Sequence, residues 1–370
     1  MHRRVSFLLF AAGWGANHFS AMLIVYRQRL HLEPSELGLL FGAYALGLVP
    51  GLILAGRASD GRGRRKLVLP ASLAAIAASL VLAFGVHGFA VLLGGRLLYG
   101  LAMGAVMSPG SVWLQELSPP ELGPRRATLA LSAGFALGPF VSGVLAEYAP
   151  WPMVVPYVAH AATLAAAVAM AEPVPETAKG SSNGAPSLAR SDVGTLARIA
   201  VMAPWVFAFP AVTMAIIPGL LRPLIARPVV FAASVILVTL ATGVLVQPLT
   251  SRLGRRADTL GLLLGAIGIW VGAESYVTSH PWLLFVAAPF AGAGYGLVIT
   301  TGLREIAEHV PAERRGTSVG IYYVLTYIGF GLPFVHAVVA RQIGDVLALR
   351  LASVLVVVCL AVRAAVRPKK

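Results

Sequence analysis

Several residues able to bind a polar ligand or a proton lie inside long apolar stretches of the sequence. Trp14, Asn17 and His18 fall in the first such stretch, and Arg96 falls in the fourth. An ionisable residue inside a membrane-spanning helix is costly and is functional by default, and histidine titrates in the physiological range. We therefore predict a polar binding site from these four residues.

Plainer interpretations of the same residues stay open. Arg96 could extend its charged end to the membrane interface, and Asn17 and His18 could simply bond between helices. No aspartate or glutamate occupies the middle of a predicted span. A coupling proton would therefore need His18, or a carboxylate such as Asp60 or Glu36 at a gate, or coupling is absent.

The composition indicates a membrane protein. The chain has 370 residues, of which 58% are hydrophobic and only 12% charged, with a mean hydropathy of +0.80. Soluble domains carry about 25% charged residues. The net charge of +14 is gathered in alternate loops, as the positive-inside rule expects of cytoplasmic loops, which argues against a nucleic-acid partner. Cys359 is the single cysteine, so no internal disulfide is possible.

The apolar runs predict an all-α integral membrane fold with twelve transmembrane helices. A span needs about 20 apolar residues, and a helix satisfies every backbone group within the lipid. The basic residues before the first span and after the last predict that both termini are cytoplasmic. The predicted spans are 5–26, 36–57, 67–87, 90–113, 127–149, 151–171, 199–221, 229–247, 258–279, 281–303, 317–339 and 345–366.

The twelve spans divide into two related halves. Residues 172–198 are long, polar and rich in proline, glycine and serine, which predicts a flexible cytoplasmic linker between a six-helix bundle at 1–171 and another at 199–370. Gly-Arg-Arg recurs at an offset of 191 residues and Arg-Arg-x-Thr at an offset of 189. Such repeats are typical of transporters, whose substrate site lies between the halves near mid-membrane.

A basic loop follows the second predicted span, and its pattern resembles the loop signature G-x-x-x-D-x-x-G-R-R of the major facilitator superfamily. This resemblance implies the major facilitator fold and a gating role in which Asp60 sits at the start of a helix of the other half, where a carboxylate is stabilised. The expected partner lies near Thr317. Alternatively, these charges only set the topology. The gating residues of the loop are Gly56, Arg57, Asp60, Gly63, Arg64 and Arg65.

Two further motifs extend the resemblance. Arg96, Gly100 and Gly104 are similar to the family's R-x-x-x-G-x-x-x-G pattern in helix 4. The run from Gly134 through Gly138 and Pro139 is close to the helix-5 motif of the family's drug/proton antiporters, with Ser142 in place of one glycine. The proline can kink the helix while the glycines permit close packing. The run could also be a hinge with no bearing on transport direction.

Aromatic residues of the second half are expected to complete a central cavity, although each could equally serve packing or the membrane interface. The predicted substrate contacts there are Trp205, Tyr295, Tyr323 and Tyr327.

Together these features predict a secondary active transporter of the plasma membrane. It would move its substrate by alternating access, with residues 1–171 rocking against residues 199–370. The resemblance favours proton-coupled export of a small amphipathic organic molecule or drug by a monomer. The alternative is an uptake permease or facilitator for a small metabolite. The sequence predicts no cofactor, metal site or ATP-binding loop. An integral-membrane enzyme is disfavoured because the eight histidines are scattered, and a sensor because the chain has no room for a signalling domain.

Overall fold

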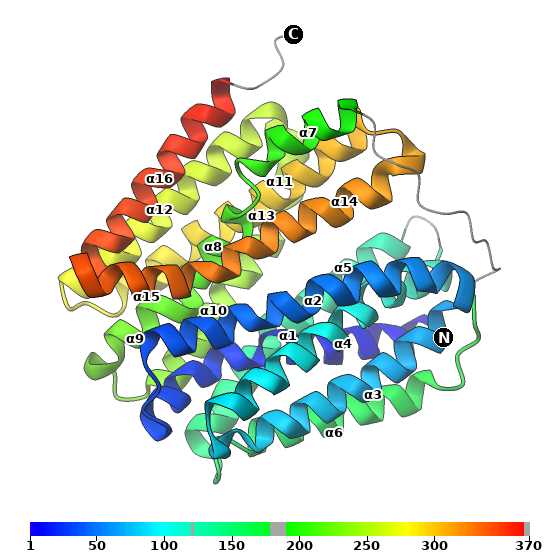
Figure 1. Ribbon diagram of the computed structural model, residues 1–370, viewed down its shortest axis with the longest axis horizontal. Helices are drawn as coiled ribbons and strands as arrows, with labels where there is room; N and C mark the ends of the chain where they lie inside the picture. Colours follow the sequence, from blue (N-terminus) through cyan, green and yellow to red (C-terminus); the bar gives the residue numbers. More distant parts are fainter. Residues whose placement is uncertain (120–121, 178–189, 366–370) are drawn as a thin grey trace. The chain divides into compact units, whose positions relative to one another are not determined.

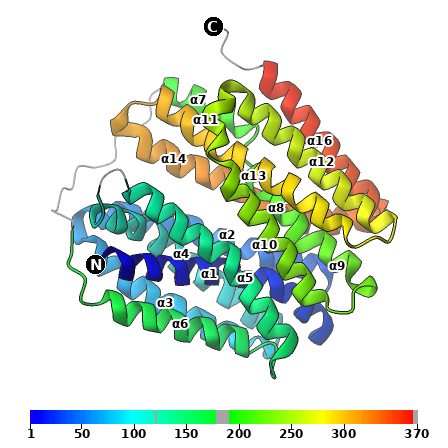
Figure 2. The same cartoon turned by 180° about the vertical axis from the view of Figure 1, so that it is seen from behind.

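The computed structural model describes residues 1–119, 122–177 and 190–365. For residues 56–57, 59–62, 190, 255 and 312–317, it describes the backbone only. The described residues form helices and no strands. The chain falls into two compact units, Met1–Asn183 with Ala232–Leu237, and Gly184–Phe231 with Val238–Lys370. The two units are coloured along the chain in Figures 1 and 2.

The first unit is a bundle of six long helices joined by short connections. In both views α3 and α6 run side by side, and α2 packs against α4 (Figures 1 and 2). The helices are α1 (His2–Arg29), α2 (Pro34–Arg62), α3 (Arg64–Ala83), α4 (Phe89–Glu116), α5 (Gly123–Tyr148) and α6 (Val155–Ala171), with a short 3₁₀ turn η1 (Gly85–His87) before α4.

The second unit is also helical, but several of its helices are interrupted. In both views α12 and α16 lie side by side (Figures 1 and 2). The elements are α7 (Arg190–Ala200), α8 (Trp205–Ala211), η2 (Val212–Ile216), α9 (Ile217–Leu221), η3 (Arg222–Leu224), α10 (Pro228–Val246), α11 (Leu249–Leu253), η4 (Gly254–Arg256), α12 (Ala257–Val277), α13 (Leu283–His309), α14 (Ala312–Tyr327), η5 (Ile328–Gly331), α15 (Leu332–Ile343) and α16 (Asp345–Ala365).

The predicted membrane-spanning architecture is confirmed. Within the described residues, 11 helical segments are long and apolar enough to cross a membrane, and the shorter apolar helix α6 occupies the place of the remaining predicted span. The chain is therefore a multi-pass membrane protein. At both ends of the expected flexible linker, 172–198, the structure shows ordered contacts or helix. Residues 172–177 bond to the first unit, as described below, and residues 190–198 form most of α7.

Glycines set how closely α2 and α4 cross. A Cβ atom on Gly100 would lie 2.1 Å from the carbonyl oxygen of Tyr44, and one on Gly104 would lie 2.4 Å from that of Leu48. Small residues let backbones approach in this way in membranes, where packing rather than hydrophobicity drives helix association. This close crossing brings Arg96, one turn before Gly100, against the carbonyl groups of α2.

A second close crossing joins α5 to α1. A Cβ atom on Gly134 would lie 2.2 Å from the carbonyl oxygen of Phe10, and one on Gly138 would lie 2.5 Å from the Cα of Trp14. The glycines of the helix-5 motif therefore serve to seat α1, and Pro139 lies within a continuous α5.

Helices of the second unit change geometry in mid-span. The helix that begins at Trp205 passes through the π-helical turn η2, which starts two residues after Pro210, and the helix α14 passes through the 3₁₀ turn η5 into α15. Such turns often occur at functional positions of helices. At Gly329 in η5 a Cβ atom would lie 2.1 Å from the carbonyl oxygen of Pro204, so the two interruptions lie on neighbouring helices.

The α2–α4 crossing generates a direct prediction. We expect Gly104→Ala to lower the melting temperature of the detergent-purified protein, because the added methyl group overpacks the interface at a cost of about 1–3 kcal/mol. Gly94→Ala on the same helix is the control, since nothing lies within 4 Å of its Cβ position. Equal melting temperatures for both variants would contradict the close crossing.

Candidate functional site

The first unit buries a guanidinium between α1, α2 and α4. Arg96 of α4 is 3% exposed. Its Nε and Nη2 atoms donate hydrogen bonds of 3.1 Å each to the carbonyl oxygens of Leu40 and Phe41 in α2. The charge therefore rests on neutral backbone acceptors of the neighbouring helix.

Aromatic rings enclose the same guanidinium. Its carbon atom lies 4.4 Å from the ring centroid of Phe19 and 4.8 Å from that of Tyr44. Contacts of this kind stabilise a cation by about 0.5–2 kcal/mol. Arg96 is thus held inside the bundle and does not extend to the membrane interface.

His18 of α1 lies in a box of rings near Arg96. Its ring centroid is 4.7 Å from that of Tyr157, 5.1 Å from that of His160 and 5.6 Å from that of Tyr99. The side chain is fully buried. We call Arg96, His18, Tyr99, Tyr157 and His160 the arginine–histidine centre.

The members of this centre other than His18 are fixed by hydrogen bonds. His160 contacts the hydroxyl of Ser79 through Nδ1 at 2.8 Å and the carbonyl oxygen of Ala11 through Nε2 at 3.0 Å. The hydroxyl of Tyr99 donates to the carbonyl oxygen of Ala12 at 3.0 Å. The hydroxyls of Tyr157 and Tyr26 bond to each other. Two of the backbone acceptors belong to α1, so these bonds also fix the helix that carries His18.

Three nitrogen atoms of the centre remain without a hydrogen-bond partner among the described residues. They are Nδ1 and Nε2 of His18 and Nη1 of Arg96. Buried polar groups almost always have a partner, so these three atoms mark the position where the centre could receive a polar ligand or a proton. Within the described part of the chain, no group of three or more His, Cys, Asp or Glu side chains could hold a metal ion.

The other predicted residues of the first unit lie beside this centre. Trp14 donates its indole N–H to the hydroxyl of Ser142 at 2.8 Å and packs edge-on to His160 with ring centroids 5.8 Å apart. Ser142, the departure from the helix-5 motif, is therefore the partner of Trp14. Asn17 is half-buried and forms no hydrogen bond with the centre among the described residues.

Aromatic rings of the second unit stack around Phe207 of α8. The ring centroid of Phe207 lies 4.7 Å from that of Tyr327, 4.8 Å from that of Phe330 and 5.8 Å from that of Tyr295. Two predicted residues, Tyr295 and Tyr327, thus meet at the interruption of α8 and α14.

The remaining two predicted aromatic residues lie outside the Phe207 stack. Trp205 stacks on Phe209, with ring centroids 5.8 Å apart. Tyr323 packs near Tyr322, with ring centroids 6.3 Å apart.

The basic loop between α2 and α3 receives a carboxylate from an unexpected source. An Oε atom of Glu176 accepts a bond from the backbone N–H of Arg64 at 2.7 Å, and the other lies 3.4 Å from that of Lys66. The first turn of a helix has free N–H groups and a partial positive charge. Gly63 has φ +102, and a Cβ atom there would lie 2.4 Å from Glu176. The positive φ favours glycine at this position.

Further contacts bind residues 172–177 to the same unit. Arg65 donates to the side chain of Glu172 at 2.7 Å, Trp113 donates to the carbonyl oxygen of Pro175 at 2.9 Å, and Thr177 bonds to Glu116. Only the backbone is described at Gly56, Arg57, Asp60 and the expected partner Thr317, so their predicted gating roles stay predictions. The loop is therefore held by its own half through Gly63, Arg64 and Arg65.

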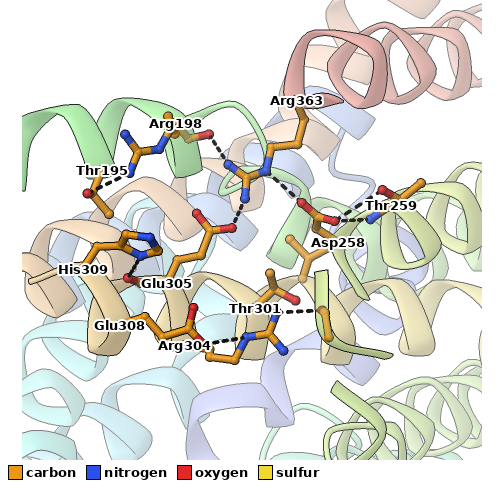
Figure 3. Close-up of polar contacts among 12 residues, drawn as sticks. Thr195, Arg198, Asp258, Thr259, Thr301, Arg304, Glu305, Glu308, His309 and Arg363 are labelled. Carbon is orange, nitrogen blue, oxygen red and sulfur yellow. Dashed lines mark hydrogen bonds and ion pairs between the residues drawn. The ribbon is translucent and has the colours of Figure 1, made fainter. Parts of the chain in front are cut away.

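The second unit has a buried ion cluster at the corresponding end of its helices. Arg363 of α16 is 2% exposed. Figure 3 shows its guanidinium directed at two carboxylates and a backbone carbonyl. It bonds to Asp258 at 2.9 Å, to Glu305, and to the carbonyl oxygen of Arg198 at 3.3 Å. We call Arg363, Asp258 and Glu305 the Arg363 cluster. It joins α16, α12 and α13 to the end of α7.

The two units place their charges at repeated positions. Glu305 follows Glu116 by 189 residues, and Arg363 follows Glu172 by 191 residues. In the first unit a basic residue at the start of α3 meets an acid after α6, whereas in the second an acid at the start of α12 meets a basic residue at the end of α16. The acidic and basic partners have therefore exchanged places between the two units. Glu305 bonds to Arg363 within its own unit.

Sequence reasoning missed several residues of these clusters. Tyr99 and His160 lie in apolar helices without a distinctive motif, and His160 is brought to His18 only by the packing of α6 against α1. A weak signal was present in Tyr99, which lies three residues after Arg96 on the same helix. Asp258 and Arg363 lie at helix ends, where charges are ordinary.

Burial predicts how strongly the two acid–base contacts differ. We expect Arg363→Gln to destabilise the protein by about 3–5 kcal/mol, because it leaves buried carboxylates without their cation. Arg65→Gln should cost no more than about 1 kcal/mol, because its pair with Glu172 is exposed. Melting temperatures in detergent measure both effects. Equal losses would show that the Arg363 cluster is not buried in solution.

The position of Glu176 predicts a local effect. In Glu176→Gln, the amides of Arg64, Arg65 and Lys66 should exchange hydrogen for deuterium faster than in the unmodified protein, because the first turn of α3 loses its negatively charged partner. Mass spectrometry of peptides covering 64–66 measures this. Glu308→Gln, at an exposed i,i+4 pair in α13, is the control and should leave these amides unchanged. Unaltered exchange in Glu176→Gln would refute the contact.

Known proteins resemble this chain at two levels. The chain is 31% identical over 109 residues to the glucose transporter GlcP of Staphylococcus epidermidis, covering 30% of this chain and 24% of the relative. It is 29% identical over 129 residues to the quinolone resistance protein NorA of Staphylococcus aureus, covering 34% of this chain and 33% of the relative. These matches span a third or less of either relative.

Solved structures share the whole fold. A D-xylose–proton symporter superposes with a TM-score of 0.82 at 16% identity, covering 99% of this chain and 97% of that one. Identity this low shows the fold alone. Residues 5–225, more than half of the chain, match the Major Facilitator Superfamily. The chain therefore belongs to the Major Facilitator Superfamily of membrane transporters.

Proposed function

We propose that this transporter exports a small amphipathic organic molecule in exchange for protons, working by alternating access. The observation that carries the proposal is the arginine–histidine centre, in which three buried nitrogen atoms have no partner among the described residues. An intramembrane ionisable group of this kind marks a substrate or proton path. His18 is the candidate proton carrier, since histidine changes charge near neutral pH.

The helix-5 motif supports the outward direction. Gly134 and Gly138 seat α1 against α5, and the residue that departs from the motif, Ser142, bonds to Trp14 of α1. The motif is therefore packed directly against the helix that carries His18. The similarity to NorA, named for quinolone resistance, points the same way. In the second unit, we propose that the rings around Phe207 contact the apolar part of the substrate.

Uptake of a small metabolite is the second candidate. The similarity to GlcP, named as a glucose transporter, favours it, as does the absence of an acidic residue from the middle of the predicted spans. A pH jump applied to proteoliposomes separates the two: export coupled to protons responds to the gradient, whereas facilitated uptake does not.

We further propose that the chain acts as a monomer in the plasma membrane with both termini in the cytoplasm. The basic loops support this orientation, because lysine and arginine are enriched in cytoplasmic loops. The contacts of Glu176 and the Arg363 cluster would then lie on the cytoplasmic side, where they would stabilise the ends of each helix bundle during gating.

Accumulation of fluorescent organic dyes in cells that lack their own efflux pumps tests the proposal. Cells producing the protein should accumulate less dye than empty-vector cells. Both a protonophore and Arg96→Ala should abolish the difference, because the first removes the proton gradient and the second removes the buried charge. Arg29→Ala, at the exposed end of α1, is the control. Unchanged accumulation across a broad dye panel, with enhanced uptake of a metabolite, would overturn export.

A further inference from the structure

The arginine–histidine centre has hydrogen-bonding capacity that its own residues leave unused. His18 is fully buried and Arg96 is 3% exposed, yet neither ring nitrogen of His18 nor Nη1 of Arg96 has a partner among the described residues. A buried polar group without a hydrogen bond costs about 1–3 kcal/mol. The surrounding groups His160, Tyr99 and Tyr157 do form hydrogen bonds. The unused capacity is therefore confined to two adjacent side chains.

The charge at this position is also uncompensated. Arg96 bonds to two neutral carbonyl oxygens and faces two aromatic rings. Among the described residues, no carboxylate forms an ion pair with it. The contrast with Arg363 is direct, because that equally buried guanidinium bonds to two carboxylates. Carbonyl and ring contacts stabilise a cation less than an anion does, so Arg96 lacks the anionic partner that Arg363 has.

The geometry of the free atoms defines the missing partner. Nη1 of a guanidinium carries two N–H donors, and an imidazole offers at least one more. His18 packs against Tyr99, which lies three residues after Arg96 on α4, so the two donors belong to neighbouring positions of α1 and α4. Carboxylate and phosphonate oxygens accept charge-assisted hydrogen bonds from such donors. An ammonium group would be repelled by Arg96, and a neutral amide would leave its charge uncompensated.

We infer that Arg96 and His18 form a binding site for an anionic oxygen group, a carboxylate or phosphonate, on the transported molecule. The inference rests on the proposed function, since it names the substrate class of the same site. The rings of Phe19 and Tyr157 beside the two donors suit an aromatic or apolar body attached to the anion. Because both donors are buried, the ligand enters in a conformer that opens the centre.

Thermal unfolding of the purified full-length protein tests the inference without relying on transport. Four ring-matched probes are compared at constant ionic strength: benzoate and phenylphosphonate as anions, benzamide as the neutral form and benzylammonium as the cation. A ligand that binds only the folded state raises the melting temperature. We expect the two anions to raise it and the other two probes to leave it unchanged.

Two variants place the effect at the site. Arg96→Gln should weaken anion binding about tenfold or more, because a hydrogen bond to a charged group is lost. His18→Phe keeps a ring of similar shape without nitrogen and should weaken it as well. Arg29→Gln removes an equal charge from the exposed end of α1 and should bind as the unmodified protein does. If a variant fails to fold, the four-probe comparison on the unmodified protein still shows whether the protein prefers anions.

Three results would overturn the inference: no shift with either anion, equal shifts with benzoate and benzamide, or anion shifts that persist in both variants. Failure of the proposed function has a different signature. Selective anion binding without movement of any dye or metabolite would refute transport by this site while leaving the anion site intact. Dye export without any preference for the anionic probes would refute the anion site while leaving the proposed export intact.

Discussion

A guanidinium buried among apolar helices constrains everything around it. In hydrocarbon each polar group must find its partners inside the protein, and Arg96 finds carbonyl oxygens on α2 and rings on α1 and α2. Those contacts require α4 to approach α2 very closely, which Gly100 and Gly104 permit. The burial of the charge therefore depends on the glycines of α4, which bring Arg96 within hydrogen-bonding distance of α2.

The second half also buries a guanidinium, but pairs it with carboxylates. Arg363 is as deeply buried as Arg96, but it lies at a helix end and bonds to Asp258 and Glu305. A paired guanidinium at a helix end holds neighbouring helices together, whereas an ionisable residue in mid-bundle is a candidate functional site. The helix interruptions and the stacked rings around Phe207 lie in this same half. The proposed function would use the first unit for polar recognition and the second for apolar contact.

The sequence predicted the fold well because lipid leaves few alternatives. Span length, charge placement and the repeated motifs were enough to identify twelve helices in two related halves. Pairing between distant side chains was harder to predict. Arg96 and His18 stood out because charge in an apolar helix is rare, but His160 gave no such signal. Asn17, next to His18 in sequence, is only half-buried, whereas His18 is fully buried among the rings of the centre. Adjacent positions on a helix face different directions, so only helix rotation and packing decide which joins the site.

The structure at the two ends of the predicted linker was hard to predict for a related reason. Proline, glycine and serine in residues 172–198 indicated flexibility, yet Glu176 finds the free N–H groups of α3, and α7 forms on the far side. The start of α3 lies more than a hundred residues before Glu176 in the sequence but next to it in space. The composition of the linker alone cannot reveal such a contact. The gating role expected of Asp60 stays a prediction, because its side chain lies outside the described residues.

The most direct measurement is dye movement driven by an imposed pH gradient in proteoliposomes, comparing the unmodified protein with His18→Phe. If the arginine–histidine centre couples protons to substrate, the gradient will drive dye across membranes containing the unmodified protein. It will fail to do so with the folded variant. Gradient-driven movement that is identical in the two proteins would contradict the account.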